Sequence, residues 1–287
     1  MRWILAVLIA LAAAPQDVVL ETVRLRPHIV VIRGGEGGNV LAMTVADTVL
    51  LVDAREATVG TQLLAALGGL PERVRVVVNT HYHEDHTGGN ALFSAAVRIA
   101  HAAVPAEARK DTTIALLGWH RSPVPEAAIP ERLIGGDTTF AVGGRRVQLL
   151  HTPAAHTSGD LMVWLPDDDV LHMGDTYELG AYPFLDVWAG GSMGGLIGAV
   201  DRALATVGPG TVIVPGHGPP SDRDELTAYR GMLVTVRERV GEALGRGLSM
   251  DSTMALGITA PFDGRYGSAR GGRRFVALTY LSLGGQP

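Results

Sequence analysis

The stretch NTHYHEDHTGG, Asn79 to Gly89, places three histidines and an aspartate within six residues, directly after the apolar run VRVVV. In an extended chain, residues two apart point the same way, so His81 and His83 can bind one metal ion from one side. Asp85 and His86 fall where the chain has begun to turn, and they can address a neighbouring position. Such a density of ligating groups disfavours a solvated polar loop. The stretch therefore predicts a metal site at the end of a strand.

Three more candidate ligands lie in turn-like stretches at or near predicted strand ends: His156 in HTPAAHTSGD, Asp175 in LHMGDTYE and His217 in IVPGHGPP. Small residues flank each of them, which allows the backbone to approach a crowded centre. Zinc binds imidazole nitrogen and carboxylate oxygen, and catalytic zinc sites keep a position for water. Three histidines with a shared carboxylate, and one aspartate with two histidines and the same carboxylate, would fill two such sites.

Composition restricts the class of protein. The chain has 287 residues, of which 47% are apolar, enough for one large domain or two small ones. Its 24 basic and 29 acidic residues give a net charge of −5, and Lys110 is the only lysine. This balance disfavours a nucleic-acid partner, because phosphate binding needs clustered positive charge. The absence of cysteine excludes a thiolate as nucleophile or as zinc ligand.

The N-terminus, MRWILAVLIALAAAPQ, combines one basic residue, an apolar run and a triple alanine. This pattern predicts a short Sec-type signal peptide over residues 1–14, which is too short to span a bilayer. The mature protein is then expected in the periplasm or outside the cell, with no stable membrane insertion after processing. An uncleaved anchor and a buried N-terminal segment are the alternatives.

Strand-like and helix-like segments alternate along the rest of the chain. The runs HIVVIRG, NVLAMTVADTVLLVDA and VRVVVNT predict strands, and EATVGTQLLAALGGLP predicts a helix. The second half repeats this outline, with strands in RRVQLLHT, DLMVWL, VLHMGDT and TVIVPGHG, a turn in PDDD and a helix in GGLIGAVDRALATV. A long helix follows from about Asp222 to Gly245, and Ser221 with Asp224 resembles a capping box at its start. Two sheet-rich halves that each carry helices indicate a layered α/β protein.

The ligand set resembles the metallo-β-lactamase fold superfamily of binuclear metallohydrolases. The family signature His-x-His-x-Asp-His corresponds to residues 81–86, and the later ligands correspond to His156, Asp175 as the metal-bridging carboxylate, and His217. The run LLVDA also matches the early strand of the family, which ends here in Asp53. The resemblance implies an αββα sandwich of two mixed sheets flanked by helices. It implies one such domain over residues 18–287, including a C-terminal helical tail.

Four outer stretches narrow the resemblance to a group of exported bacterial members, some of them linked to quinoprotein systems. These stretches are GGEGGN, YPFLDVWAGGSMGG, PGHGPPSDRDEL and FDGRYGSARGGRRFVALTYLSL. They are less specific than the metal set, and they name no substrate.

The resemblance implies two Zn²⁺ ions, and a bridging hydroxide that attacks a carbonyl carbon. Asp85 would both bind metal and orient the nucleophile, accepting its proton. Asp53 and Thr80 are candidates for holding the histidine rings in place. Iron and manganese also remain possible as the bound metals. Related folds use iron, and oxygen ligands tolerate both iron and manganese. Five histidines among seven ligands favour zinc.

The same resemblance favours a small ester, thioester or lactone as substrate. The commonest β-lactamase subclass uses a cysteine ligand, which this chain lacks, and the histidine-only subclass generally lacks a carboxylate where Asp175 stands. Hydrolysis of a β-lactam amide remains the alternative. So do a non-catalytic zinc-binding protein and a serine hydrolase, since GGSMG around Ser192 satisfies Gly-x-Ser-x-Gly. A flexible glycine loop with Ser192 as a helix cap is the simpler interpretation of that stretch.

Aromatic residues in the Gly-rich stretch after Asp175 predict a loop over the metals that helps to bind an apolar substrate: Tyr177, Tyr182, Phe184 and Trp188. The alternative is that they anchor a long loop to the core. The remaining histidines lack a ligand context and are interpreted as surface or core residues: His28, His101, His120, His151 and His172. His151 and His172 lie close to ligands in sequence and could support them.

Overall fold

The apolar runs of the first half of the chain form neighbouring strands of one large sheet. The computed structural model describes residues 18–35 and 37–286. The strand order is β1-β2-β3-β4-β5-β6-β9, with β1 to β4 antiparallel and β4, β5, β6 and β9 parallel. The strands are β1 (Glu21–Arg26), β2 (Ile29–Arg33), β3 (Val40–Val45), β4 (Thr48–Val52), β5 (Val74–Val78), β6 (Val97–His101) and β9 (Arg132–Ile134).

The run NVLAMTVADTVLLVDA is a hairpin of β3 and β4 rather than one strand. Ala46 adopts a left-handed backbone with φ 48°, which turns the chain between Val45 and Thr48. Nothing in the apolar pattern marks this turn apart from the charged residue Asp47.

The second half of the chain supplies a smaller sheet of order β10-β11-β12-β13-β14. Its strands are β10 (Thr138–Val142), β11 (Arg145–Thr152), β12 (Asp160–Leu165), β13 (Val170–His172) and β14 (Val212–Val214). Neighbours are antiparallel except for β13 and β14, which are parallel. The predicted strands over residues 145–152 and 160–165 are confirmed, and PDDD forms the turn before β13, where the Asp168 amide donates to the Leu165 carbonyl at 3.1 Å.

Side-chain alternation along the strands explains how the two sheets pack. Leu41 and Met43 of β3 point into a core that also contains Leu161 and Val163 of β12. Val40, on the opposite face of β3, packs in a separate cluster with α1 (Gly60–Leu67). The outer face of the smaller sheet packs in a third cluster, which includes residues of three long helices: α4 (Met193–Thr206), α5 (Arg223–Gly245) and α8 (Ala269–Ser282).

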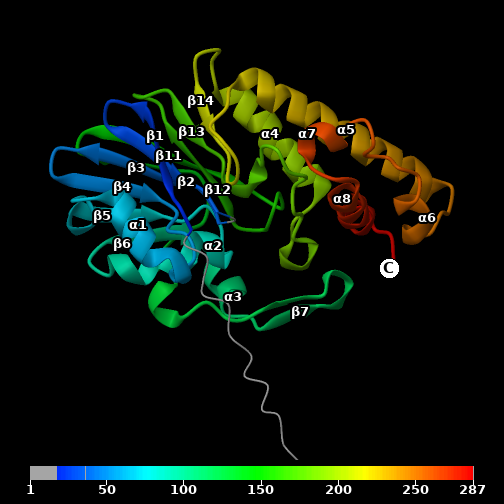
Figure 1. Ribbon diagram of the computed structural model, residues 1–287, viewed down its shortest axis with the longest axis horizontal. Helices are drawn as coiled ribbons and strands as arrows, with labels where there is room; N and C mark the ends of the chain where they lie inside the picture. The colour runs from blue at the N-terminus through cyan, green and yellow to red at the C-terminus, as the bar shows by residue number, and fades with distance from the viewer. Residues whose placement is uncertain (1–17, 36, 287) are drawn as a thin grey trace, which may run out of the picture.

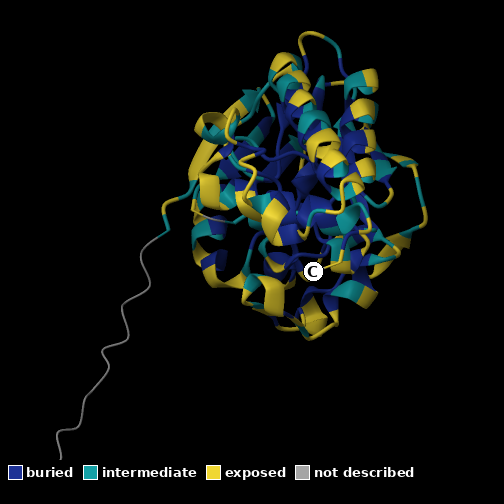
Figure 2. Cartoon of the chain, turned by 90° about the vertical axis from the view of Figure 1, so that its right-hand side faces the viewer, coloured by how far each residue is buried: buried dark blue, intermediate teal, exposed yellow. Residues whose placement is uncertain are grey.

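Helices therefore cover both outer faces of the paired sheets (Figure 1). Buried residues concentrate in the middle of the molecule, and exposed ones mark the outer sides of the helices (Figure 2). The shorter helices are α2 (Glu84–Thr87), α3 (Val104–Ala108), α6 (Met250–Met254) and α7 (Asp263–Tyr266). The predicted fold class, a mixed α/β sandwich with helices outside, is confirmed.

A two-stranded hairpin of β7 (Thr112–Ile114) and β8 (Trp119–Arg121) projects from the body toward the C-terminal helices (Figure 1). It was not predicted from the sequence. Its strands, TTI and WHR, contain no apolar run that would mark them in the sequence.

The start of α5 corrects one prediction. Its N-cap is Asp222, whose carboxylate accepts the amide hydrogens of Asp224 and Glu225, each at 3.0 Å. The capping box predicted from Ser221 and Asp224 is wrong, because the Ser221 hydroxyl instead donates to the Tyr177 phenol oxygen at 3.1 Å.

The predicted signal peptide, residues 1–14, lies outside the described residues. Among the residues that are described, no helix is long and apolar enough to cross a membrane.

Candidate metal centre

Strand direction brings the predicted ligands to one edge of the sandwich. Asp53 follows β4 and the 81–86 segment follows β5, and these two strands run parallel. Asp175 and His217 follow β13 and β14, which are also parallel. Since the carboxyl ends of parallel strands meet at the same edge, residues distant in sequence become neighbours. His156 joins them from the loop between β11 and β12.

The seven predicted ligands form two adjacent groups. Within each group, one potential ligand atom per residue lies within 4.8 Å of all the others; the groups are His81, His83, His156 and Asp175, and Asp85, His86 and His217. Asp175 also faces the second group. Its Oδ2 atom lies 3.7 Å from His81 Nε2 and 3.4 Å from His217 Nε2, and its Oδ1 atom lies 3.1 Å from His86 Nε2. One buried carboxylate thus addresses both groups.

Outer hydrogen bonds fix the tautomers of the first group. His81 Nδ1 lies 3.0 Å from the Thr80 hydroxyl, and His156 Nδ1 donates to the Phe184 carbonyl at 2.7 Å. His83 Nε2 lies 3.0 Å from the carboxylate of Asp186. Each ring therefore turns its unprotonated nitrogen inward.

The distances between these inward-facing nitrogen atoms indicate whether the site fits a metal ion. His83 Nδ1 lies 3.0 Å from both His81 Nε2 and His156 Nε2. With the outer nitrogens protonated, all three are acceptors, and such close acceptors repel one another unless a cation lies between them. In the second group, the buried atoms His86 Nε2 and Asp175 Oδ1 form no properly oriented hydrogen bond within the described structure. The cluster fits a two-metal site.

Asp53 and Thr80 hold the second group from outside. Asp53 accepts from His86 Nδ1 at 2.7 Å, and from both the amide and the hydroxyl of Thr80 at 2.8 Å. Asp53 is fully buried and adopts φ 64°, a left-handed conformation that aspartate tolerates better than most residues. Asp53 and Thr80, the two candidates for holding the histidine rings, thus contact His86 and His81 respectively.

Opposite charges dominate the second group. Burial lowers the pKa of His217, but Asp175 and Asp85 outweigh burial and raise that pKa to about 11. Burial also opposes the protonation of His86, yet Asp175, Asp85 and Asp53 hold its pKa well above the usual value. The pKa of Asp175 lies well below the usual value, because His86 and His217 outweigh its burial. Without a metal, this group is therefore a network of imidazolium and carboxylate ions.

Two glycines allow the backbone to approach the cluster. A Cβ atom on Gly216 would lie 1.9 Å from Asp175 Oδ1, and one on Gly38 would lie 2.4 Å from His86 Cε1. Buried Arg55 holds the Gly38 loop in place by donating to the carbonyls of Gly34 and Gly38 at 2.7 and 3.1 Å. Any side chain at Gly38 or Gly216 would displace the cluster.

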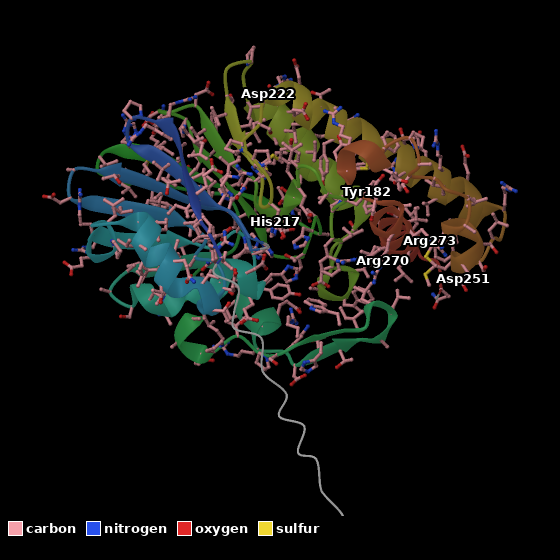
Figure 3. The ribbon with its side chains drawn as sticks, in the orientation of Figure 1. Tyr182, His217, Asp222, Asp251, Arg270 and Arg273 are labelled. Carbon is pink, nitrogen blue, oxygen red and sulfur yellow. The ribbon has the colours of Figure 1, made fainter. Side chains whose placement is uncertain are left out.

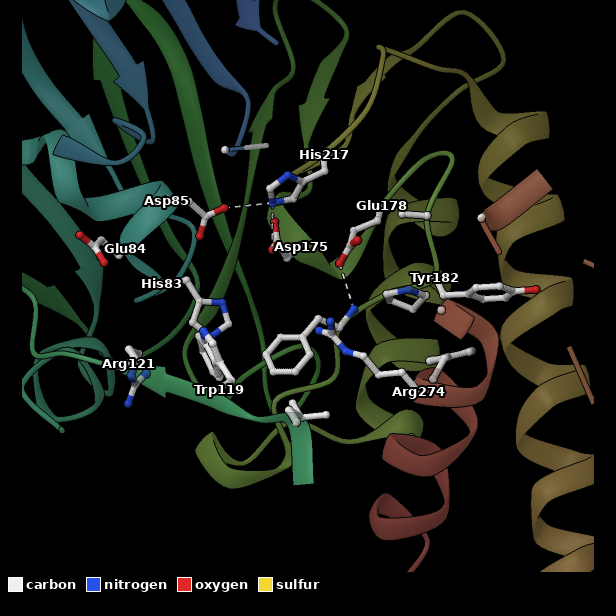
Figure 4. A pocket seen from close by; sticks show the side chains of 18 of the residues that line it. His83, Glu84, Asp85, Trp119, Arg121, Asp175, Glu178, Tyr182, His217 and Arg274 are labelled. Atoms are coloured by element: carbon white, nitrogen blue, oxygen red, sulfur yellow. Dashed lines mark hydrogen bonds and ion pairs between the residues drawn. The ribbon is translucent and has the colours of Figure 1, made fainter. Parts of the chain in front are cut away.

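A cavity of about 1070 Å³ opens beside the cluster. His83, Asp85, Asp175 and His217 form its inner end, and the β7–β8 hairpin and α8 form its walls (Figure 4). Its apolar lining includes Trp119, Tyr182, Phe184, Tyr266 and Phe275. The volume suits a substrate of several linked groups.

Some aromatic residues of the predicted substrate loop line the cavity, as a substrate-binding loop requires, and others anchor the loop to the core. Phe184 lines the cavity, with its ring centroid 5.8 Å from that of His83. Tyr182 lines it too, but its hydroxyl donates to the Thr259 carbonyl at 3.0 Å and so anchors the loop (Figure 3). Trp188 borders a smaller neighbouring cavity of about 90 Å³. Tyr177 is fully buried against Tyr229 and is an anchor.

Ser192 does not have the environment of a serine nucleophile. It is the N-cap of α4: its hydroxyl donates to the Ala154 carbonyl at 2.7 Å and accepts from the Gly195 amide at 3.0 Å. The segment before it is the 3₁₀ turn Val187–Ala189 instead of a strand. The structure favours the capping interpretation.

The other histidines lie outside the cluster. His28 pairs with Asp168 at 2.7 Å, His120 pairs with Asp111 at 2.8 Å, and the rings of His101 and His151 stack at 3.8 Å. His172 is buried, which lowers its pKa to about 4, and its Nδ1 accepts from the Gly174 amide at 3.1 Å, next to Asp175.

Sequence reasoning missed several residues at the site. Asp186 accepts from Tyr82, His83 and the Ala189 amide. Glu178 accepts from the Phe184 amide at 3.0 Å, and Arg274 reaches the cavity from α8. No local motif marks these residues. Tyr82 and His83 reach Asp186 from a distant segment, and Glu178 binds a backbone amide, which any residue type can supply.

Comparisons with known proteins agree with this geometry. Residues 30–221 match the family model described as the metallo-beta-lactamase superfamily. A hydroxyacylglutathione hydrolase from Nitrosococcus oceani is 31% identical over 147 residues, which cover 50% of this chain and 49% of that protein. One from Rhodospirillum rubrum is 27% identical over 201 residues, covering 68% of this chain and 66% of that protein. The chain thus spans half to two thirds of these relatives.

Among solved structures, a metallo-beta-lactamase from Pontibacter korlensis has a similar fold, with a TM-score of 0.58 and 21% identity, covering 75% of this chain and 98% of that chain. The family match includes every residue of the two ligand groups. The chain belongs to the metallo-beta-lactamase superfamily.

Proposed function

We propose that this chain is a metal-dependent hydrolase that binds two metal ions, with zinc as the preferred metal, and cleaves a thioester, ester or lactone. The main observation is that Asp175 faces both ligand groups, at 3.4 Å from His217 and 3.7 Å from His156. A carboxylate in this position suits a paired centre. The similarity to proteins named hydroxyacylglutathione hydrolase supports a thioester among the substrates.

The ligands in this proposal are the seven predicted residues, with His81, His83 and His156 at one metal, Asp85, His86 and His217 at the other, and Asp175 between them. Bound metal ions would supply a water that ionises near neutral pH and a Lewis acid for a carbonyl oxygen. Imidazole donors in the majority favour zinc over manganese.

Asp85 is the proposed catalytic residue of the chain. Its side chain is 34% exposed and lines the cavity, whereas Asp175 is only 6% exposed. Burial raises the pKa of Asp85, but His86 and His217 outweigh it and hold that pKa well below the usual value. The Asp85 carboxylate is therefore ionised at neutral pH, and it can orient a water molecule and accept its proton.

The cavity walls position the rest of the substrate. The Trp119 and Phe184 rings lie 5.7 Å apart, next to His83. They offer an apolar surface to an acyl or leaving group and keep bulk water from the reacting carbonyl.

A substrate panel on purified protein tests the proposal. The zinc-loaded chain should hydrolyse members of a series of thioesters, esters and lactones, and Asp85→Asn should lower kcat at least about a hundredfold. Turnover of β-lactams alone would instead establish the lactam alternative, and failure of every substrate with two zinc ions bound would refute hydrolysis. Ion content measured with zinc, iron and manganese would identify the metal.

We also propose export after removal of residues 1–14, and a single domain over residues 18–287. The resemblance to exported bacterial members supports this proposal. N-terminal sequencing of the protein from periplasm and cytoplasm tests it, since an intact Met1 in every fraction would contradict cleavage.

A further inference from the structure

Charged side chains on the cavity wall suggest what the substrate carries. Beyond the ligand histidines, the cationic residues of the lining are His120, Arg121 and Arg274. His120 pairs with Asp111 at 2.8 Å. Arg121 lies over the Tyr82 ring at 4.3 Å and donates to the Thr112 hydroxyl at 3.2 Å. His120 thus has a carboxylate partner. Arg121 is buried and uses one donor on Thr112, although its Nε and Nη1 atoms have no partner in the described structure.

Arg274 differs from both. Among residues 18–35 and 37–286, no carboxylate lies within 4.0 Å of its guanidinium, and it forms no hydrogen bond there. Its guanidinium carbon lies 4.7 Å from the Phe184 ring centroid. Stacking uses the face of the guanidinium and leaves its in-plane N–H groups free to donate. Arg274 therefore offers an open, permanent positive charge to the cavity (Figure 4).

Neighbouring contacts hold this charge near the metal centre. Phe184, under Arg274, lies with its ring centroid 6.0 Å from that of His156. Glu178 lines the same wall, and its carboxylate accepts from the Phe184 amide at 3.0 Å. It makes no ion pair with Arg274 within 4.0 Å, but it acts on that charge from farther away: burial lowers the pKa of Arg274, and Glu178 opposes this. One aromatic ring thus separates the guanidinium from the ligand histidines.

We propose that the substrate is an amphiphilic anion, with an apolar body against Trp119 and Phe184 and an anionic group, such as a carboxylate or sulfonate, paired with Arg274. This proposal deepens the hydrolase proposal and depends on it for the reacting carbonyl. The cavity of about 1070 Å³ accommodates such a molecule, whereas a small neutral ester would fill little of it. Arg274 lies beyond residues 30–221, so the family match does not assign this role.

The test compares two probes of similar size and shape, one anionic and one neutral. Biphenyl-4-sulfonate is the anion, and 4-(methylsulfonyl)biphenyl is its neutral analogue; sulfonates are weak metal ligands, so their binding reports on the wall. Calorimetry on the zinc-loaded full chain should show about tenfold tighter binding of the sulfonate. Arg274→Gln should remove this preference and leave the affinity for the neutral probe unchanged. Arg274→Lys should retain part of it.

Exposed residues on the same helix provide matched controls. Arg270 and Arg273 lie on α8 (Figure 3) and do not line the cavity. Arg270→Gln and Arg273→Gln should keep the full preference for the sulfonate. Equal affinities in the wild type, or a preference that survives Arg274→Gln, would overturn the proposal. Melting temperatures check folding, and if Arg274→Gln is unfolded, Arg274→Lys and Arg274→Met decide by the same comparison.

The outcome separates the two proposals. A sulfonate preference that depends on Arg274, without turnover of any substrate, would refute hydrolysis and retain the anion site. Turnover of a substrate without any preference for the sulfonate would support hydrolysis and refute the anion site. Where both hold, Arg274→Gln should raise KM for an anionic thioester about tenfold while changing kcat little.

Discussion

Two carboxylates outside the proposed ligand set each orient one histidine of the cluster. Asp53 accepts from His86 at 2.7 Å, and Asp186 accepts from His83 at 3.0 Å. The pKa of Asp186 stays below the usual value although burial opposes ionisation, because His83 and Tyr82 donate to it. Asp186 is therefore a charged partner of the His83 imidazole, which makes that ring a better donor, and Asp53 accepts a hydrogen bond from the His86 ring in the same arrangement.

We expect Asp53→Asn to weaken binding of the metal at Asp85, His86 and His217 by about ten- to a hundredfold, because His86 loses its carboxyl acceptor. Asp186→Asn should have the same effect on the other metal. Competition with a chromophoric chelator measures both affinities. Asp201→Asn, which changes only an exposed pair with Arg230, is the matched control. Unchanged affinities in both cluster variants would contradict this role.

Metal binding should release protons. The pKa of His217 is raised to about 11 and that of His86 is also raised, so both rings are protonated at pH 7 in the metal-free protein. A metal needs them neutral, and we expect loading to release about two protons and the affinity to fall as pH falls. Calorimetry in buffers of different ionisation enthalpy counts these protons. A count near zero at pH 7 would show that the rings were already neutral.

The sequence was sufficient to propose the seven candidate ligands and two of their partners, Asp53 and Thr80, but not Asp186 or the Phe184 carbonyl. Ligating residues of the 81–86 segment lie close together in sequence, so spacing alone reveals them. Asp186 lies more than a hundred residues after Tyr82, and the Phe184 carbonyl that holds His156 can belong to any residue type. Only the path of the loop after Asp175 brings these groups to the cluster.

At the scale of elements, the role of Ser192 as a helix cap can be distinguished by experiment from a role as a nucleophile. Ser192→Ala removes the cap of α4, and we expect it to lower the free energy of unfolding by about 1 kcal/mol without abolishing turnover. Urea unfolding and activity on the best panel substrate measure the two effects. Loss of activity in a folded variant would revive the serine mechanism.

The start of α5 allows a direct comparison of adjacent residues. Asp222→Ala should cost about 1 kcal/mol of stability, because two amides lose their acceptor. Ser221→Ala should cost less, since Ser221 contributes only a bond to Tyr177. Thermal unfolding of the two variants measures the difference. The reverse order would restore the capping box that the sequence suggested.

Elements that contain an apolar run were predictable, including the three-residue strands β13 and β14, and elements without such a run were not. The strands over residues 145–152 and 160–165 have clear apolar patterns and appear as predicted. The three-residue strands β7, β8 and β9 have no pattern long enough to detect, and their positions depend on what they pack against.

For the whole molecule, the cluster joins the two sheets. Residues after β5 belong to the larger sheet, and those after β13 and β14 belong to the smaller one. We expect metal removal by a chelator to lower the melting temperature by about 5 to 10 °C, because metal binds only the folded state. Readdition of zinc should restore it. An unchanged melting temperature would mean that the metal adds no cross-link between the sheets.

The placement of α8 has a consequence for engineering. The helix forms one wall of the cavity but supplies none of the cluster ligands. By contrast, the loop from Asp175 to Asp186 both lines the cavity and holds the histidines, so changes there disturb the metals. Gly271 and Arg274, which line the cavity from α8 outside its buried core face, can therefore be randomised in a library to change which molecules enter without changing the cluster residues.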